Sequence, residues 1–130
     1  MPNPSAAMLV IGDKILSGRT RDANMHYLAG ELTRAGIDLR EVRVVSDDPG
    51  AIVAGVQALS AAYDVVFTSG GIGPTHDDIT AENVARAFDR PISVRDDARA
   101  ILVAHYAARE QELNEARLRM ARIPDGATLI

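Results

Sequence analysis

The sequence predicts an α/β fold in which helices connect the strands of a parallel sheet. Three short apolar or β-branched runs, at residues 7–11, 39–45 and 64–68, predict strands. Between these runs, apolar residues recur at helical spacing over residues 22–35 and again from about 49 to 63. Strands that alternate with helices in this order are typical of a parallel sheet with right-handed crossovers.

The two predicted helices have start and stop signals. Gly36 follows the first helix, where a helix end favours a left-handed residue. Asp47-Asp48-Pro49 supplies an N-cap and a proline near the first position of the second helix. The apolar faces would be formed by Met25, Leu28, Ala29 and Leu32 in the first helix and by Ile52, Val56 and Leu59 in the second.

The pattern after the third strand is weaker. A third helix is expected to start near Asp78 or Thr80. The further expected elements are a short strand at 92–94, helices over 96–109 and 114–122, and a strand start at 127–130. Because a turn signal at Pro124–Ala127 opens this last strand, we expect residues 1–130 to form a single domain that lacks its final strands.

Composition excludes several classes of function. Fourteen Lys and Arg against 18 Asp and Glu give a net charge of −4, which provides no basic surface for nucleic acid or anionic lipid. No apolar run approaches the roughly 18 to 20 residues that a membrane helix needs. Without cysteine there are no disulfides, thiolates or zinc-thiolate sites. Together with an amino terminus that lacks a secretory signal, these features predict a cytoplasmic protein without nucleic-acid or membrane partners.

Three polar or glycine-rich loops follow the predicted strands, at residues 12–20, 46–48 and 69–78. In an open parallel sheet, ligands bind outside the carboxyl ends of the strands, where loops and helix N-termini meet. Free backbone N–H groups at those N-termini favour an anion. We therefore expect a binding site for an anionic small molecule at this edge.

The third loop is the most informative. Gly70, Gly71 and Gly73 can adopt positive φ and let backbone N–H groups approach a phosphate closely, and Pro74 stiffens the exit of the loop. The following Thr75-His76-Asp77-Asp78 places two carboxylates beside this phosphate site. They would repel the ligand unless a divalent cation, such as Mg²⁺, lies between them.

Each of these features has an alternative interpretation. The glycines could form a tight strand-to-helix turn with Asp78 as an N-cap, and Asp47-Asp48 could be an N-cap alone. His76 is either a metal ligand or a solvated loop residue. Ser17 lacks an adjacent base in the sequence, so we interpret it as a hydrogen-bond donor to phosphate. The spacing of the glycines fits neither a dinucleotide-binding fingerprint nor a P-loop.

Taken together, four stretches resemble the molybdopterin-binding domain family, and within it CinA-type domains and the related domain fused to eukaryotic FAD synthase. They are Gly12-Asp13-x-Ile15-Leu16-x-Gly18, Asp22-x-Asn24, Asp47, and Gly70-Gly71-Ile72-Gly73-Pro74-Thr75-His76-Asp77-Asp78-Ile79-Thr80. The resemblance covers nearly the whole chain. It implies a three-layer α/β/α sandwich with a mostly parallel central sheet.

The resemblance also implies roles for individual residues. Asp47 and Asp78 match catalytic aspartates, and Asp13, Asp77 and Asp78 match metal-binding positions. The positions that would bind the phosphates or the rest of the ligand are Gly12, Ser17, Gly18, Asn24, Ser69, Gly70, Gly71, Gly73, Pro74, Thr75 and Thr80.

CinA-type domains are associated with metal-dependent cleavage of pyrophosphate bonds in ADP-ribose or FAD. The resemblance therefore implies a hydrolase that uses Mg²⁺, Mn²⁺ or Co²⁺, binds a phosphorylated nucleotide or pterin, and forms homo-oligomers. One alternative is molybdopterin adenylylation in molybdenum cofactor biosynthesis. Another is a non-catalytic module that binds molybdopterin or a nucleotide, which is favoured by Lys14, where CinA-type sequences commonly have glutamate.

Overall fold

The computed structural model describes residues 2–130, which form two compact units that meet in the sequence at Gly70 and Gly71. The first unit contains β1 (Ser5–Ile11), α1 (Asp13–Leu16), α2 (Asn24–Ala35), β2 (Asp38–Val45), α3 (Pro49–Ala62) and β3 (Val65–Ser69). The second contains α4 (Thr80–Ala87), β4 (Ile92–Val94), α5 (Asp96–Ala108), α6 (Glu115–Leu118), a 3₁₀ turn (Arg119–Ala121) and β5 (Arg122–Pro124). None of the helices in the described residues has the length and apolar character needed to cross a membrane.

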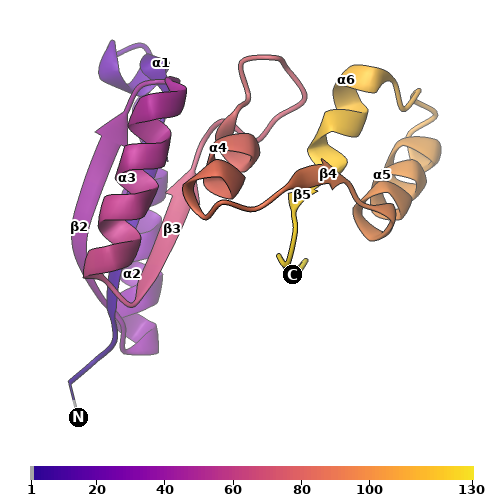
Figure 1. Cartoon of the computed structure of the whole chain (residues 1–130). Coiled ribbons are helices and arrows are strands. Elements are labelled where there is room, and N and C mark those ends of the chain that lie inside the picture. The colour runs from indigo at the N-terminus through magenta and orange to yellow at the C-terminus, as the bar shows by residue number, and fades with distance from the viewer. Residues whose placement is uncertain (1) are drawn as a thin grey trace. The chain divides into compact units, whose positions relative to one another are not determined.

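The first unit is built on a parallel sheet with the strand order β2-β1-β3. Its carboxyl ends are in register, because Ile11 lies opposite Val45 and Val10 lies opposite Ser69. The crossover through α2 leads from the central strand to β2, and the crossover through α3 leads back past β1 to β3. Right-handed crossovers in opposite directions place the two helices on opposite faces, as Figure 1 shows. The predicted α/β fold with a parallel central sheet is therefore confirmed.

The core of this unit lies around the central strand. Residues Ala6–Ile11 are at most 3% exposed, as expected for a strand that is paired on both sides and covered on both faces. Leu9 is fully buried, and Gly55 of α3 comes so close to it that a Cβ at position 55 would lie 2.9 Å from Leu9 Cδ1. Ile52, Val56 and Leu59 are buried as predicted. Close packing of α3 on β1 therefore fixes the height of the helix above the sheet.

The helix signals in the sequence act as predicted. Gly36 ends α2 in the left-handed conformation, with φ +79°. Asp48 caps α3 by accepting a hydrogen bond from the N–H of Ala51 at 2.8 Å, and Pro49 is the first residue of the helix. Met25, in contrast, is 43% exposed, so the predicted apolar face of α2 is wrong at this position. Of the described residues of α2, Leu32 alone is buried.

The second unit contains a two-stranded antiparallel sheet, in which Ser93 of β4 lies opposite Ile123 of β5. Helix α4 packs on β5, and α5 packs on the 3₁₀ turn. The predicted third helix starts at Thr80, and the strand at 92–94 and the helix from 96 are confirmed. Thr80, Asn83 and Ala85 of α4 are buried.

Three details differ from the sequence-based expectations. The helix predicted over 114–122 ends at Leu118, because residues 122–124 leave it to pair with β4. The strand predicted at 127–130 is wrong: the chain turns at Gly126, where φ is +87°, and Arg95 Nη1 donates a hydrogen bond to the carbonyl of Ala127. Finally, the loop after β1 contains the short helix α1, which the sequence pattern did not indicate.

The packing of α3 on β1 generates the first prediction. Leu9→Ala removes a fully buried side chain from beneath Gly55 and should lower the free energy of unfolding by about 2 to 5 kcal/mol. Leu16→Ala is the matched control, because Leu16 is 56% exposed and its loss should change stability by less than about 0.5 kcal/mol. Urea titrations measure both values. Equal effects of the two substitutions would contradict this account of the core.

Candidate functional site

The candidate site of the first unit lies at the carboxyl edge of its sheet, defined here as the chain segments that directly follow β1, β2 and β3. These are Gly12-Asp13, Ser46-Asp47 and Gly70. The N–H of Gly12 still donates to the carbonyl of Val45 at 3.0 Å, so the first two segments leave the sheet together. The order β2-β1-β3 places the topological switch point between β1 and β3, where parallel sheets of this kind bind ligands.

Asp13 and Asp47 form a reciprocal pair at this edge. The N–H of Asp13 donates to Asp47 Oδ2 at 3.1 Å, and the N–H of Asp47 donates to Asp13 Oδ1 at 3.1 Å. Each carboxylate therefore uses one oxygen to bind the other loop and has a second oxygen outside this pair. We call these two residues the aspartate pair. Although 34 positions separate them in the sequence, the fold places them side by side.

Asn24 and Ser69 form a second contact at the carboxyl edge. Asp22 holds the start of α2 by accepting from the N–H groups of Asn24 at 3.2 Å and Met25 at 3.1 Å. This holds the backbone of Asn24, and its side-chain Nδ2 donates to the Ser69 hydroxyl oxygen at 2.8 Å. The pair spans 45 positions and links the start of α2 to the last residue of β3.

Gly70 is required by its close approach to β1. Its φ is +95°, and a Cβ at this position would lie only 2.0 Å from the carbonyl oxygen of Ile11. No other residue fits here without moving the backbone. The glycine therefore keeps the exit of β3 directly against the end of β1. The positive φ predicted for Gly70 is observed, and the approach to a phosphate stays a prediction.

Ser17 and Gly18 lie at the end of α1. The Ser17 hydroxyl donates to the carbonyl of Lys14 at 3.4 Å, and the N–H of Thr20 donates to the same carbonyl at 3.0 Å. Gly18 has φ +79°, with no atom within 4 Å of the position a Cβ would take. The conformation of this turn thus depends on the backbone of Gly18 and not on packing around it.

In the second unit, the segment from Gly71 to Ile79 is held by its own hydrogen bonds. The N–H of Thr80 donates to the carbonyl of Gly71 at 3.0 Å, and a Cβ on Gly71, where φ is +66°, would lie 2.2 Å from Thr80 Oγ1. A Cβ on Gly73 would lie 2.8 Å from Asp78 Oδ2. Glycine is thus needed at position 71, whereas a Cβ at position 73 would displace the Asp78 carboxylate; Pro74 follows directly.

Asp78 is the centre of this segment. Its Oδ2 accepts from the N–H of Thr75 at 3.0 Å and from the Thr75 hydroxyl at 2.7 Å. Partial burial acts to raise the pKa of Asp78, but the hydrogen bonds from Thr75 and from the backbone of Gly73, with the charge of Arg119, outweigh it and lower that pKa. Asp78 is therefore ionised near neutral pH. It is not the N-cap of α4, since Ile79 occupies that position.

Asp77 is in a different environment from its neighbour. Its side chain is 79% exposed, and its Oδ1 lies 3.3 Å from Nε2 of His76, whose side chain is 87% exposed. Among residues 2–130, no group of three or more acidic or histidine side chains is arranged to hold a metal ion. The metal-binding role that the resemblance implies for Asp13, Asp77 and Asp78 therefore stays a prediction.

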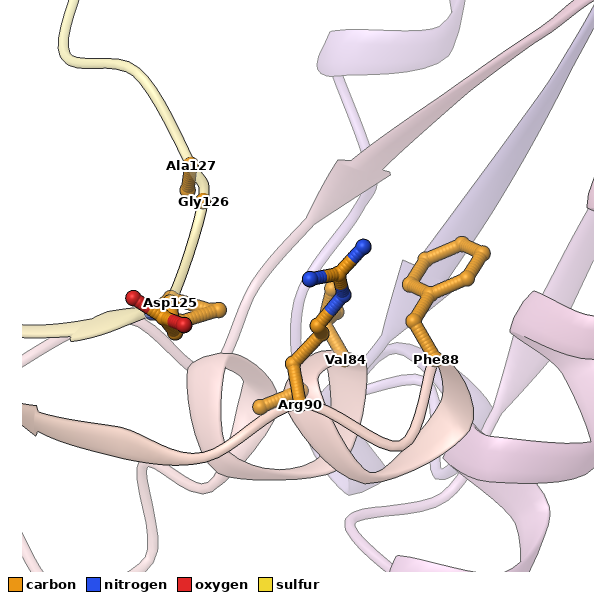
Figure 2. A pocket seen from close by; sticks show the side chains of 8 residues that line it. Val84, Phe88, Arg90, Asp125, Gly126 and Ala127 are labelled. Carbon is orange, nitrogen blue, oxygen red and sulfur yellow. The ribbon is translucent and has the colours of Figure 1, made fainter.

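The second unit also contains a cleft of about 420 Å³ that the sequence did not indicate. Figure 2 shows Arg90 and Phe88 beside Val84 on one side and the turn at Asp125–Ala127 on the other. It is lined by Val84, Ala85, Phe88, Arg90 and Pro124–Ala127, none of which is a predicted site residue.

Comparisons with known proteins agree with the resemblance in the sequence. A family model described as "Probable molybdopterin binding domain" matches residues 7–122. A Caenorhabditis elegans protein named "Probable FAD synthase" is 48% identical over 95 residues, which are 73% of this chain and 18% of the nematode protein. A "CinA-like protein" of Desulfosudis oleivorans is 34% identical over 125 residues, or 96% of this chain and 30% of that protein. The chain thus spans only part of the length of these relatives.

Solved structures show the same relationship. The crystal structure of CinA from Thermoplasma acidophilum superimposes with a TM-score of 0.86 at 32% identity and covers 96% of this chain and 73% of that one. The tungsten cofactor synthesizing protein MoaB from Pyrococcus furiosus has a TM-score of 0.63 at 24% identity, over 84% of this chain and 68% of its own. The MoaB likeness indicates a shared fold.

The close approach of Gly70 to β1 can be tested by comparing Gly70 with Gly18, because φ is positive at both glycines. Gly18→Ala should cost about 1 to 2 kcal/mol, because only the left-handed backbone is strained there. Gly70→Ala adds a collision with Ile11 O and should cost about 3 to 5 kcal/mol. Thermal and urea unfolding measure both. A Gly70→Ala protein as stable as Gly18→Ala would show that β3 does not need to approach β1 this closely.

The contacts of Asp78 generate a pH-dependent prediction. A lowered pKa in the folded state stabilises the protein above the unfolded value of about 3.9, and this contribution is lost as the pH falls through the lower folded pKa. Thr75→Val removes the hydroxyl donor, so NMR titration should show a higher Asp78 pKa, and the stability difference from wild type should shrink in acid. Thr75→Ser keeps the hydroxyl and should behave as wild type. An unchanged Asp78 pKa in Thr75→Val would contradict the assignment.

Proposed function

Because the chain belongs to the molybdopterin-binding domain family and is similar to CinA-type proteins, we propose that it hydrolyses a pyrophosphate bond in a nucleotide with the help of a divalent metal ion. The substrate class is that of ADP-ribose or FAD, in which a pyrophosphate joins an adenosine to a second group. Similarity to nematode proteins named FAD synthase supports an adenine dinucleotide as ligand. Self-association and a cytoplasmic location are further predictions of the same proposal.

The observation that supports this proposal best is the position of the aspartate pair. Asp13 and Asp47 lie at the ends of β1 and β2, and Ser69 and Gly70 lie at the end of the strand that pairs with β1 on its other side. A hydroxyl and closely packed glycine backbone are suited to phosphate oxygens, whereas the adjacent carboxylates are suited to a cation. A pyrophosphate with a bound cation presents both kinds of group.

The aspartate pair also fits the kind of metal site that the family implies. Mg²⁺ usually keeps several waters and binds one or two protein carboxylates together with substrate phosphates. The second oxygens of Asp13 and Asp47 could supply two hard ligands. A bound divalent cation would neutralise phosphate charge and favour ionisation of a bound water.

Asp47 and Asp78 have different roles in the proposed reaction. We assign Asp47 the role of orienting or deprotonating the attacking water, since its carboxylate is fixed by the N–H of Asp13 at the same edge of the sheet as the proposed phosphate site. Asp78 is a weak base because its pKa is lowered. In this proposal Asp78 acts as an ionised group that orders the segment from Gly73 to Thr75.

Two alternatives share the same ligand chemistry. Adenylyl transfer to molybdopterin is favoured by the likeness to the molybdopterin biosynthesis Mog protein of Mycobacterium ulcerans, at 28% identity and a TM-score of 0.57 over 64% of this chain and 55% of that one. A binding module without turnover is favoured by Lys14, whose positive charge lies next to the proposed metal position at Asp13. The products distinguish them: AMP from ADP-ribose, AMP transferred from ATP to molybdopterin, or bound ligand without product.

The direct test is AMP release from ADP-ribose or FAD in the presence of Mg²⁺, Mn²⁺ or Co²⁺, followed by chromatography. Asp47→Asn should lower kcat at least about 100-fold, because the amide keeps an acceptor for the N–H of Asp13 but loses the charge and the base. The matched control is Asp48→Asn, which removes the same charge one residue away and retains a good N-cap.

We expect Asp48→Asn to stay within about twofold of wild type, since its carboxylate caps α3 and Asn caps a helix equally well. Absence of metal-dependent AMP release from the wild-type protein would refute the hydrolase proposal. Equal losses in the two variants would show that net charge, and not the position of Asp47, is what matters.

A further inference from the structure

The contact between Asn24 and Ser69 has a direction that matters for ligand binding. Asn24 Nδ2 lies 2.8 Å from the Ser69 hydroxyl oxygen. An amide nitrogen is a donor and cannot accept a hydrogen bond, so the Ser69 oxygen must be the acceptor in this contact. The one proton of the Ser69 hydroxyl is then not used by Asn24.

The surroundings of both residues are fixed. Asp22 holds the backbone of Asn24 through its own N–H, and Ser69 is the last residue of β3, opposite Val10 of the buried central strand. The next residue, Gly70, is held against Ile11 by a contact that leaves no room for a Cβ. The Ser69 hydroxyl accepts a hydrogen bond from Asn24. Among residues 2–130, no acceptor for the Ser69 proton is found.

We propose that Asn24 is a positioning residue that makes the Ser69 hydroxyl a hydrogen-bond donor to an ionised phosphate oxygen of the ligand. The inference rests on the proposed function and names the ligand group at this position. The contact with Asn24 leaves the Ser69 proton available, and an ionised phosphate oxygen can only accept, so the two groups are complementary. Asn24 itself would not touch the ligand, which differs from the binding role that the resemblance implies.

The experiment measures binding and not turnover, so that its failure is distinct from failure of the hydrolase proposal. The probe is inorganic phosphate, titrated into ¹⁵N-labelled protein while the amide signals of Gly70 and Gly71 are followed. Ser69→Ala should weaken phosphate binding about tenfold, as expected for loss of a hydrogen bond to a charged group. Ser69→Thr keeps the hydroxyl and should bind within about twofold of wild type.

A double-mutant cycle tests the role of Asn24. Asn24→Ala should weaken phosphate binding about fivefold when Ser69 is present and should have no effect in the Ser69→Ala protein, because it acts only through that hydroxyl. Asn3→Ala is the matched control: its amide also donates to a side chain, that of Asp38 at 3.2 Å, but at the other end of the sheet. It should leave phosphate binding unchanged.

The Asn24→Asp variant shows whether Asn24 acts by setting the direction of its hydrogen bond to Ser69 or only by holding the two chain segments together. The carboxylate can still hydrogen-bond Ser69, but now as the acceptor, so the fold should be kept while the hydroxyl proton turns away from the ligand. Phosphate binding should weaken about tenfold and stay weak near 1 M salt, where charge effects extend only about 3 Å. Recovery of binding at high salt, additive effects in the cycle, or no phosphate binding by the wild type would each overturn the inference.

Discussion

The reciprocal hydrogen bonds between Asp13 and Asp47 are the interaction on which the arrangement of the carboxyl edge depends. Two carboxylates brought together repel each other, and here each is stabilised by a backbone N–H of the opposite loop. The pair ties the exit of β1 to the exit of β2, while Gly70 holds the exit of β3 against Ile11. Three loops distant in the sequence thus meet at one edge, two joined by reciprocal hydrogen bonds and the third held by the close approach of a glycine.

In this arrangement, different protein groups are suited to different parts of the ligand. Carboxylate oxygens are suited to a cation, and the Ser69 hydroxyl with the glycine backbone is suited to phosphate oxygens. The net charge of −4 excludes a polyanion held by a basic surface, but it does not oppose a small phosphate ligand, because the attraction comes from local donors and a metal. The buried strand β1 supplies the rigid base that such a site needs.

Local patterns in the sequence predicted most of the first unit. The apolar run of β1, the stop at Gly36 and the cap at Asp48 each depend on neighbouring residues, and all are confirmed. The errors occur where distant residues decide the outcome. Residues 122–124 form a strand because β4 is available to pair with them, and the residues that follow turn at Gly126. Likewise, no local pattern shows that Asn24 donates to Ser69 or that Asp78 binds Thr75, although the family resemblance marked these residues for binding.

The central claim is that the carboxyl edge binds phosphate and a divalent cation together. The most direct measurement is a crystal structure of the protein with ADP-ribose and Mn²⁺, because Mn²⁺ is located by its anomalous scattering. The account predicts Mn²⁺ at the second oxygens of Asp13 and Asp47, with a phosphate oxygen accepting from the Ser69 hydroxyl. Well-ordered ADP-ribose in the cleft beside Arg90 and Phe88, with no cation at the aspartate pair, would contradict it.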